Sequence, residues 1–386
     1  MRPAFAPFSL VLCAVLAVVL GGCGPTALVA YRPDDPPTVH LPLAQAQIRD
    51  ARPAFASLFA RELADQPETL QAWLHGPGPA DANAPLASLS ALDERFDAQR
   101  AATSVLIVPG LFSDCIGDQS VPFGDGEVRP ESEAVRAAYR HYGDLGLRDL
   151  RLVPLPGRVS ARQNGALLAA ALQDEAARPE VGQIVVVAYS KGVPDLLEAL
   201  ASLAPDGRPP AKLAAVVAVA GVVAGTPLAD HYEGLYGAIS PHLSPFGCTP
   251  AEGGEVESLT RRERLRWLAA HPLPRGIAYY SIVAYATDDE TAPLLRTPKG
   301  LLAPADPRND GQIIASDAIL PASTLLATAR ADHLDIALPL DRNPNILVRQ
   351  LVSGRHYPRE ALLRATLRWV VAATARAATT PETLPP

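Results

Sequence analysis

A run of apolar, mostly β-branched residues passes directly into a helical pattern at residues 183–204, and this junction constrains the fold more than any other feature of the chain. Residues 183–189 read QIVVVAY, which is typical of a strand that is buried on both faces. Residues 191–204 read KGVPDLLEALASLA, with the apolar spacing of a helix. Ser190 stands between the two elements and therefore lies at a tight corner.

The same succession of strand and helix recurs along most of the chain. Strands that are apolar on both faces and alternate with helices indicate an α/β protein, in which helices cover both faces of a mostly parallel sheet. Residues 227–275 are irregular apart from one helix near 258–271, and a long loop follows a strand at 277–286. Other strands are expected at 104–110, 150–155, 212–223 and 323–331, and other helices at 44–74, 131–146, 161–177 and 358–377.

The first residues predict export. Residues 1–22 hold one arginine and an apolar run from Phe8 to Leu20, which is short for a membrane span and typical of a signal peptide. The run ends in Leu-Gly-Gly-Cys, which resembles a bacterial lipobox, so we expect Cys23 to become the lipidated first residue of the mature protein. Gly24 resembles the pattern that directs lipoproteins to the outer membrane, on the periplasmic side. An ordinary cleaved signal or an N-terminal anchor is the alternative.

The rest of the chain divides where its composition changes. Residues 23–43 are proline-rich and predict a tether, and residues 44–100 predict an N-terminal helical extension. The α/β domain is expected at 101–377, followed by a tail at 378–386. The irregular insertion at 228–275 has the aromatic content of a lid over an acyl pocket, or of ordinary packing.

Net charge bears on the binding partners of the chain, and cysteine content bears on its disulfides. The formal net charge is −7 and no run of lysine or arginine stands out, which argues against a nucleic-acid partner. With Cys13 in the signal peptide and Cys23 at the lipid site, Cys115 and Cys248 remain. An exported compartment permits a disulfide between these two, and two free buried thiols are the alternative.

Ser190 is the candidate nucleophile. In a parallel α/β sheet, active groups gather at the carboxyl ends of strands, where Ser190 stands. A sharp strand-to-helix turn requires small residues two places before and two places after the serine, and these positions hold Ala188 and Gly192. Such a turn exposes the hydroxyl and directs backbone N–H groups of the helix N-terminus toward the same space. The alternative is a serine that only caps a helix.

A serine hydroxyl needs a base to become a nucleophile, and the order of the chain restricts the choice. In this type of site the partners follow in the order serine, acid, histidine. His333 follows the strand at 323–331 in a loop and is the candidate base. His356 precedes Tyr357 and a proline at a helix start, and we expect it to be a surface or capping residue.

The acid has two candidate positions. Asp288, Asp289 and Glu290 directly follow the strand at 277–286, where topology alone places the acid. Asp310 lies further along the chain, in PRNDGQII.

Several segments resemble the secreted bacterial triacylglycerol lipases of the α/β-hydrolase fold. In those enzymes a Tyr-Tyr-Ser strand precedes an Asn-Asp-Gly turn whose aspartate is the acid, and an NHLDE-like segment follows whose histidine is the base. The resemblance covers roughly residues 104–340 and implies that Asp310, 23 positions before His333, is the acid. The matching segments are VPGLFSD (108–114), AGTPLAD (224–230), GIAYYS (276–281), NDG (309–311) and DHLD (332–335).

The resemblance also implies an oxyanion hole, formed by the backbone N–H groups of Leu111 and Lys191. The chain departs from the family at both places, with Pro109-Gly110 instead of His-Gly and Lys191 where histidine or glutamine is common. We expect the Lys191 side chain to be solvated, and attraction of an anionic substrate is the alternative. The lipases bind calcium through two aspartates, one of which matches Asp335, but its partner has no match. We therefore expect no cofactor, and we expect Asp335 to accept a hydrogen bond from the backbone near the histidine loop.

These features predict a serine ester hydrolase, a lipase or carboxylesterase that acts on a small-molecule or lipid ester through an acyl-enzyme. A polyester depolymerase or a thioesterase would use the same three residues. The alternative from another class is a non-catalytic envelope lipoprotein built on a hydrolase fold.

Overall fold

A computed structural model of the chain describes residues 46–63, 70–76, 86–111, 143–239, 253–342, 346–350 and 352–374. The signal peptide, Cys23, the tether, Cys115, Cys248 and the C-terminal tail lie outside these ranges, as does most of the helix expected at 131–146. Within the described residues, no helix is long and apolar enough to cross a membrane.

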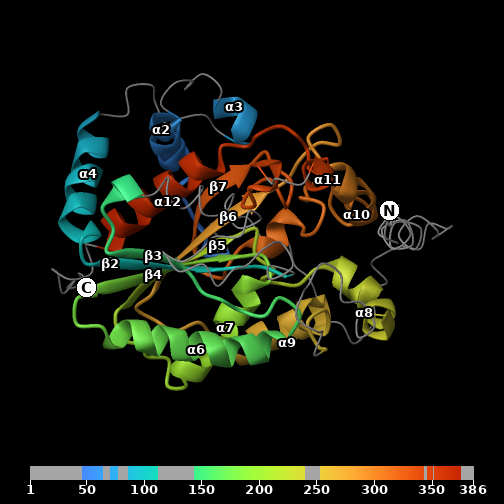
Figure 1. Cartoon of the computed structure of the whole chain (residues 1–386), viewed down its shortest axis with the longest axis horizontal. Helices are drawn as coiled ribbons and strands as arrows, with labels where there is room; N and C mark the ends of the chain where they lie inside the picture. The colour runs from blue at the N-terminus through green and yellow to red at the C-terminus, as the bar shows by residue number, and fades with distance from the viewer. Residues whose placement is uncertain are drawn as a thin grey trace, which may run out of the picture.

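The centre of the fold is a sheet of seven described strands, and every neighbouring pair is parallel (Figure 1). The strand order is β1-β7-β6-β5-β4-β2-β3, so β4, which precedes Ser190, lies inside the sheet. The strands are β1 (Arg49–Asp50), β2 (Thr103–Val108), β3 (Asp149–Leu152), β4 (Gln183–Tyr189), β5 (Leu213–Val219), β6 (Ala278–Ala284) and β7 (Thr324–Ala329).

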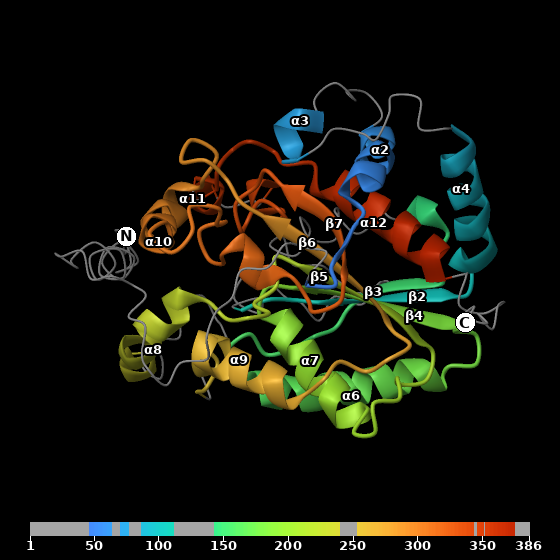
Figure 2. The same ribbon diagram turned by 180° about the vertical axis from the view of Figure 1, so that it is seen from behind.

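Helices cover both faces of the sheet, as the sequence predicts (Figures 1 and 2). On one face lie α2 (Arg52–Glu62), α4 (Leu86–Arg100) and α12 (Arg359–Thr374), and on the other α6 (Ala161–Ala177), α7 (Gly192–Leu203) and α9 (Arg261–Ala270). The strands β2, β4 and β5 supply apolar side chains to both layers: Val187 packs toward α12, whereas Val186 packs toward α6 and α7. This two-sided burial is the reason why the strands are continuous apolar runs.

The N-terminal extension belongs to the same fold. Phe55, Leu58 and Phe59 lie on one side of α2, and they are fully buried in the core that α12 shares. The sequence predicts only helix here, but β1 adds a short strand at the edge of the sheet beside β7. A four-residue helix, α3 (Leu70–Trp73), follows. The extension therefore closes one face and one edge of the sheet.

Two helices occur where the sequence predicts irregular structure or a long loop. They are α8 (Pro227–Ile239) and α10 (Pro293–Leu302), and they contact each other. α10 contains Pro298 and Gly300, which are poor helix formers, so local propensity does not reveal it. Leu295 and Leu302 are instead buried, and Leu302 packs with Leu228 of α8. Tertiary packing stabilises this helix.

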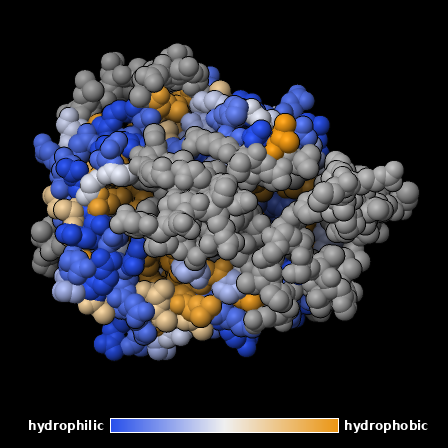
Figure 3. Space-filling model, in the orientation of Figure 1, coloured by the Kyte–Doolittle hydropathy of each residue, from blue (hydrophilic) through white to orange (hydrophobic). Residues whose placement is uncertain are grey.

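The remaining described elements are short. A four-residue helix, α11 (Ile346–Arg349), and 3₁₀ turns at Gly143–Leu145, Glu257–Leu259, Ala315–Ala318 and Leu340–Arg342 complete them. On the face shown in Figure 3, the described surface is largely hydrophilic with small apolar patches. The large apolar side chains exposed among the described residues are Leu167, Leu294 and Ile346.

Candidate active site

Ser190 occupies a strained corner between β4 and α7. Its φ is +54°, a left-handed value that a non-glycine residue adopts only when its surroundings hold it there. Its N–H donates to the Val219 carbonyl (3.2 Å), and its own carbonyl accepts from Val193 (3.1 Å) and Val222 (3.2 Å). These bonds fix the corner from the neighbouring strand β5 and from α7.

A close contact with backbone explains why the residue two places after Ser190 is glycine. A Cβ atom on Gly192 would lie 2.5 Å from the Pro109 carbonyl oxygen and 2.6 Å from that of Val108, both at the end of β2. Real Cβ atoms do not approach backbone so closely, so this position requires glycine. The neighbour that excludes a side chain is thus the adjacent strand.

The loop after β2 lies against the nucleophile. A Cβ atom on Gly110 would be 2.9 Å from the Ser190 Cβ, so the backbone of this loop passes directly beside the serine. The next residue, Leu111, and Lys191 are the two expected oxyanion donors. Within the part of the chain that the structure describes, neither backbone N–H has a hydrogen-bond acceptor. Free N–H groups at the start of a helix and beside a serine hydroxyl suit a developing negative charge.

The side chains of the three predicted residues form one hydrogen-bonded chain. His333 Nε2 lies 2.8 Å from Ser190 Oγ, and His333 Nδ1 lies 2.7 Å from Asp310 Oδ2. All three residues are buried, with exposed fractions of 7% for Ser190, 6% for His333 and 1% for Asp310. They come from loops after β4, β6 and β7, which end at the same edge of the sheet.

The Asn-Asp-Gly turn orients the carboxylate of Asp310. Its Oδ1 accepts from the N–H groups of Gln312 (2.8 Å) and Ile313 (2.7 Å), which leaves Oδ2 for the histidine. Asn309 is fully buried, and its Oδ1 accepts from the N–H of Gly311 (3.1 Å). Gly311 has φ +90°, which a residue with a side chain would adopt only under strain.

The alternative acids lie elsewhere. Asp288 is paired with Lys299 (2.8 Å) and its side chain is 90% exposed. Glu290 accepts from Arg330 (2.6 Å). Asp289 is exposed. The side chain of His356 is 74% exposed and pairs with Asp341 (2.9 Å), which agrees with the surface role expected for it.

The expectation that the Lys191 side chain is solvated is wrong. The residue is 1% exposed, and Nζ lies 2.7 Å from the carboxylate of Asp195, one helical turn further along α7. Asn164 of α6 donates to the same carboxylate (2.7 Å). Burial raises the pKa of Asp195 to about 6, although Lys191 opposes this shift. The Lys191 side chain is therefore directed into the protein and not into solvent.

Asp335 also differs from expectation in its partner. Its carboxylate accepts from the Ser353 hydroxyl, and its pKa is raised by burial. The backbone N–H groups near the histidine are instead bound by Asp332, which accepts from Leu334 (2.9 Å), Asp335 (2.9 Å) and Ala292 (2.7 Å). Among the described residues, no group of three or more histidine, cysteine, aspartate and glutamate side chains could hold a metal ion.

Sequence reasoning missed two residues that contact the histidine loop. Asp332 directly precedes His333, and Tyr189 directly precedes Ser190 and donates its hydroxyl to the His333 carbonyl. The sequence offered one signal for their roles, which is that each stands directly before a candidate catalytic residue. The partner of the Tyr189 hydroxyl is 144 residues away in the chain, so its role needs the fold.

Three solved structures are similar to this chain to different degrees. The metagenomic carboxyl esterase MGS0156 matches with 34% sequence identity and a TM-score of 0.70, over 87% of this chain and 96% of that chain. Bacillus licheniformis lipase BlEst2 in mature form matches with 18% identity and a TM-score of 0.47, over 69% and 92% of the two chains. Lipase 1 from Pelosinus fermentans matches with 11% identity and a TM-score of 0.42, over 73% and 100%.

No family model and no curated protein matches the chain. Its identity with the carboxyl esterase extends over most of both chains, and the parallel sheet has helices on both faces. The chain belongs to the α/β-hydrolase superfamily.

Proposed function

We propose that this chain is a serine hydrolase of carboxylic esters, in which Ser190 is the nucleophile, His333 the general base and acid, and Asp310 the residue that orients the histidine. The observation that supports this most directly is the 2.8 Å contact between Ser190 Oγ and His333 Nε2, continued by the 2.7 Å contact from Nδ1 to Asp310. The 34% identical neighbour is a carboxyl esterase, which supports the same reaction class.

In the first half of the reaction, Ser190 Oγ attacks the ester carbonyl carbon while His333 Nε2 takes the hydroxyl proton. Asp310, which accepts from Nδ1, stabilises the imidazolium that forms. The carbonyl oxygen gains negative charge and binds to the N–H groups of Leu111 and Lys191. Removing one such donor from an enzyme typically costs about 10² to 10³ in rate. His333 then protonates the departing alcohol, and an acyl-Ser190 ester remains.

In the second half, a water molecule replaces the alcohol. His333 takes a proton from the water, the resulting hydroxide attacks the acyl carbon, and the same oxyanion donors bind the charge again. The proton passes to Ser190 Oγ as the acid leaves. Water is the only co-reactant, so the proposed reaction needs no metal or organic cofactor.

We also propose that Cys23 is acylated and holds the enzyme on the periplasmic side of the cell envelope, within reach of lipid esters. The lipobox-like residues before Cys23 support this, because acyl chains anchor a protein without a spanning helix. The substitution Cys23→Ala should move the protein from the membrane fraction to the soluble fraction. Unchanged membrane association would contradict lipid anchoring at this residue.

The reaction is tested with p-nitrophenyl esters from acetyl to palmitoyl and with a fluorophosphonate probe, which reacts only with an activated serine. Wild type should hydrolyse a subset of the esters and take up one probe, and Ser190→Ala should do neither. Ser202→Ala, an exposed serine on α7, is the control and should keep both properties. Labelling of the Ser190→Ala variant, or no labelling of folded wild type, would refute the assignment.

A further inference from the structure

Tyr189 connects the nucleophile strand to the histidine loop. It is the last residue of β4, and its side chain lies on the α12 side of the sheet, with an exposed fraction of 8%. Its hydroxyl donates to the backbone carbonyl of His333. The tyrosine and imidazole rings are also in contact, with centroids 5.1 Å apart and planes tilted by 31°.

The hydroxyl completes a set of bonds that fixes the backbone of His333. The His333 N–H donates to the Asp310 carbonyl (2.9 Å), and Asp332 binds the N–H groups that follow. Within the described ranges, Tyr189 supplies the sole donor to the His333 carbonyl. Burial, and the charges of three nearby carboxylates of which Asp310 acts most strongly, hold the pKa of the Tyr189 hydroxyl well above its usual value. The hydroxyl therefore stays protonated and remains a donor.

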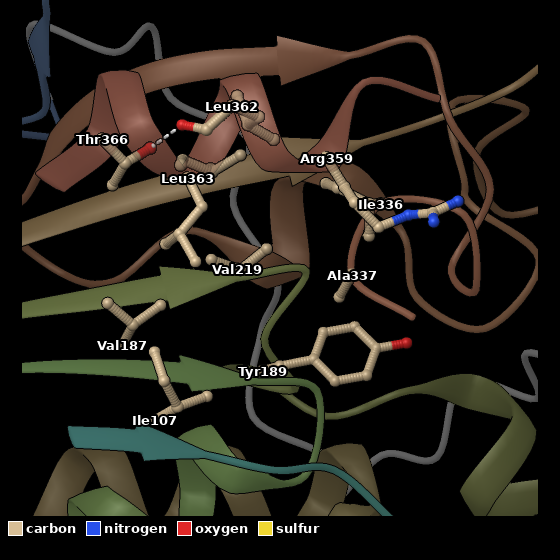
Figure 4. Close-up of a pocket in the computed structure, with 11 residues that line it drawn as sticks. Ile107, Val187, Tyr189, Val219, Ile336, Ala337, Arg359, Leu362, Leu363 and Thr366 are labelled. Carbon is tan, nitrogen blue, oxygen red and sulfur yellow. Dashed lines mark hydrogen bonds between the residues drawn. The ribbon is translucent and has the colours of Figure 1, made fainter. Parts of the chain in front are cut away.

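The tyrosine ring and the histidine loop border the same cavity. The ring forms part of the wall of a mainly apolar cavity of about 90 Å³ between the sheet and α12 (Figure 4). Val187 and Val219 form the sheet side of the cavity, and Ile336 and Ala337, from the loop that carries His333, form another side. The hydrogen bond and the ring contact join the ring to this loop beside that open space.

We propose that Tyr189 is a positioning residue, whose hydroxyl holds the His333 loop so that the imidazole stays within hydrogen-bonding reach of Ser190. This inference rests on the function proposed above. A small displacement of a general base is costly, since proton transfer and attack must occur in one geometry. The Tyr189 hydroxyl acts through the backbone carbonyl of His333.

The test compares two buried tyrosines that each donate to a backbone carbonyl. Tyr189→Phe removes the bond to His333, and Tyr357→Phe removes a bond to the Trp73 carbonyl (3.3 Å), in which no residue of the triad takes part. Both residues belong to the same apolar core, and each contacts another ring, so the two variants are matched in burial and chemistry. Circular dichroism and thermal unfolding show whether each variant is folded at the assay temperature.

For Y189F we expect kcat and the rate of fluorophosphonate labelling to fall about tenfold, with little change in KM. For Y357F we expect both rates to stay within about twofold of wild type. Tyr189→4-aminophenylalanine places a weaker hydrogen-bond donor at the same position and should give a kcat between those of Y189F and wild type. If Tyr189 acted only through the packing of its ring, no such recovery would be expected. This variant replaces Y189F in the test if Y189F does not fold.

Wild-type rates in Y189F, or equal losses in Y189F and Y357F, would overturn the role of Tyr189. So would a wild-type kcat in the 4-aminophenylalanine variant if Y189F does not fold. None of these results would refute the reaction, because labelling of wild type and of Ser190→Ala tests it separately. Unlabelled wild type would refute the proposed function itself.

Discussion

Gly192 lies against the end of the neighbouring strand, so closely that a Cβ atom would be 2.5 Å from the carbonyl oxygen of Pro109. This contact joins the two segments from which the proposed site takes its oxyanion donors, because Pro109 precedes Leu111 and Gly192 follows Lys191. The glycine thus permits the nucleophile turn to sit beside the loop after β2. The distance between the two donors depends on it.

Gly192→Ala should therefore damage the site. The added methyl group meets backbone on β2, so the turn or the strand has to move, and both oxyanion donors move with it. We expect kcat to fall by about 10² or more, since that is the typical cost of losing one donor. Steady-state kinetics with a p-nitrophenyl ester measures this change.

The matched control is Gly300→Ala, in the interior of α10, where an added Cβ has no neighbour within 4 Å. Alanine is favoured over glycine in a helix, so this variant should keep full activity and gain about 0.5 to 1 kcal/mol of stability. Full activity in G192A would contradict the proposed dependence of the site on this contact.

Lys191 and Asp195 should depend on each other for stability. Both are buried, with side chains 1% and 2% exposed, and they are 2.7 Å apart. Removing one member leaves an unpaired buried charge, which typically costs about 3 to 5 kcal/mol. We expect Lys191→Met and Asp195→Asn each to lower the free energy of unfolding by about this amount, and the double variant to lose much less than the sum. Urea unfolding of the four proteins measures the coupling, and additive losses would argue against a coupled pair.

The elements around Ser190 were predictable because their physical signals are local. Continuous apolar runs become strands that are buried on both faces, and the α6 and β4 boundaries agree with the sequence prediction. The burial of Lys191 was not predicted, although Asp195 stands four residues later, at the spacing of a helical ion pair. The sequence does not show that α6 packs beside this pair, where its Asn164 donates a hydrogen bond to the Asp195 carboxylate.

The position of the acid depends equally on tertiary structure. Topology favoured Asp288, Asp289 or Glu290, shortly after β6, but α10 intervenes before Asp310, which lies beside His333. α10 was not predicted because it contains Pro298 and Gly300. The resemblance to lipases, and not the composition of the segment, gave Asp310. Its 2.7 Å contact with His333 agrees with that choice.

Asp310→Asn should separate the two candidate acids. An amide at this position cannot stabilise the imidazolium and favours the wrong histidine tautomer, which lowers kcat about 10⁴-fold in enzymes of this mechanism. Asp288→Asn is the control, because Asp288 is exposed and paired with Lys299. We expect it to keep kcat within about twofold. A large loss in D288N together with an active D310N would reverse the assignment.

Asp332 should make stability depend on pH in a direction opposite to that of most paired carboxylates. Burial, with a contribution from Asp335, raises the pKa of Asp332 to about 6, from an ordinary value of 3.8. Between these values the folded protein binds a proton that the unfolded chain does not bind. The contribution of Asp332 to the free energy of unfolding is therefore highest at low pH, and it falls as the pH rises through about 6.

Asp332→Asn removes this titration and keeps a side-chain oxygen to accept from the backbone N–H groups of the histidine loop. The variant loses at least one of the three hydrogen bonds, so it should be less stable than wild type. Urea unfolding at about pH 4.5 and about pH 7.5 gives the difference between the two proteins at each pH. We expect the advantage of wild type to be larger at the lower pH. An advantage that is equal at both, or larger at the higher pH, would mean that Asp332 does not bind a proton preferentially in the folded state.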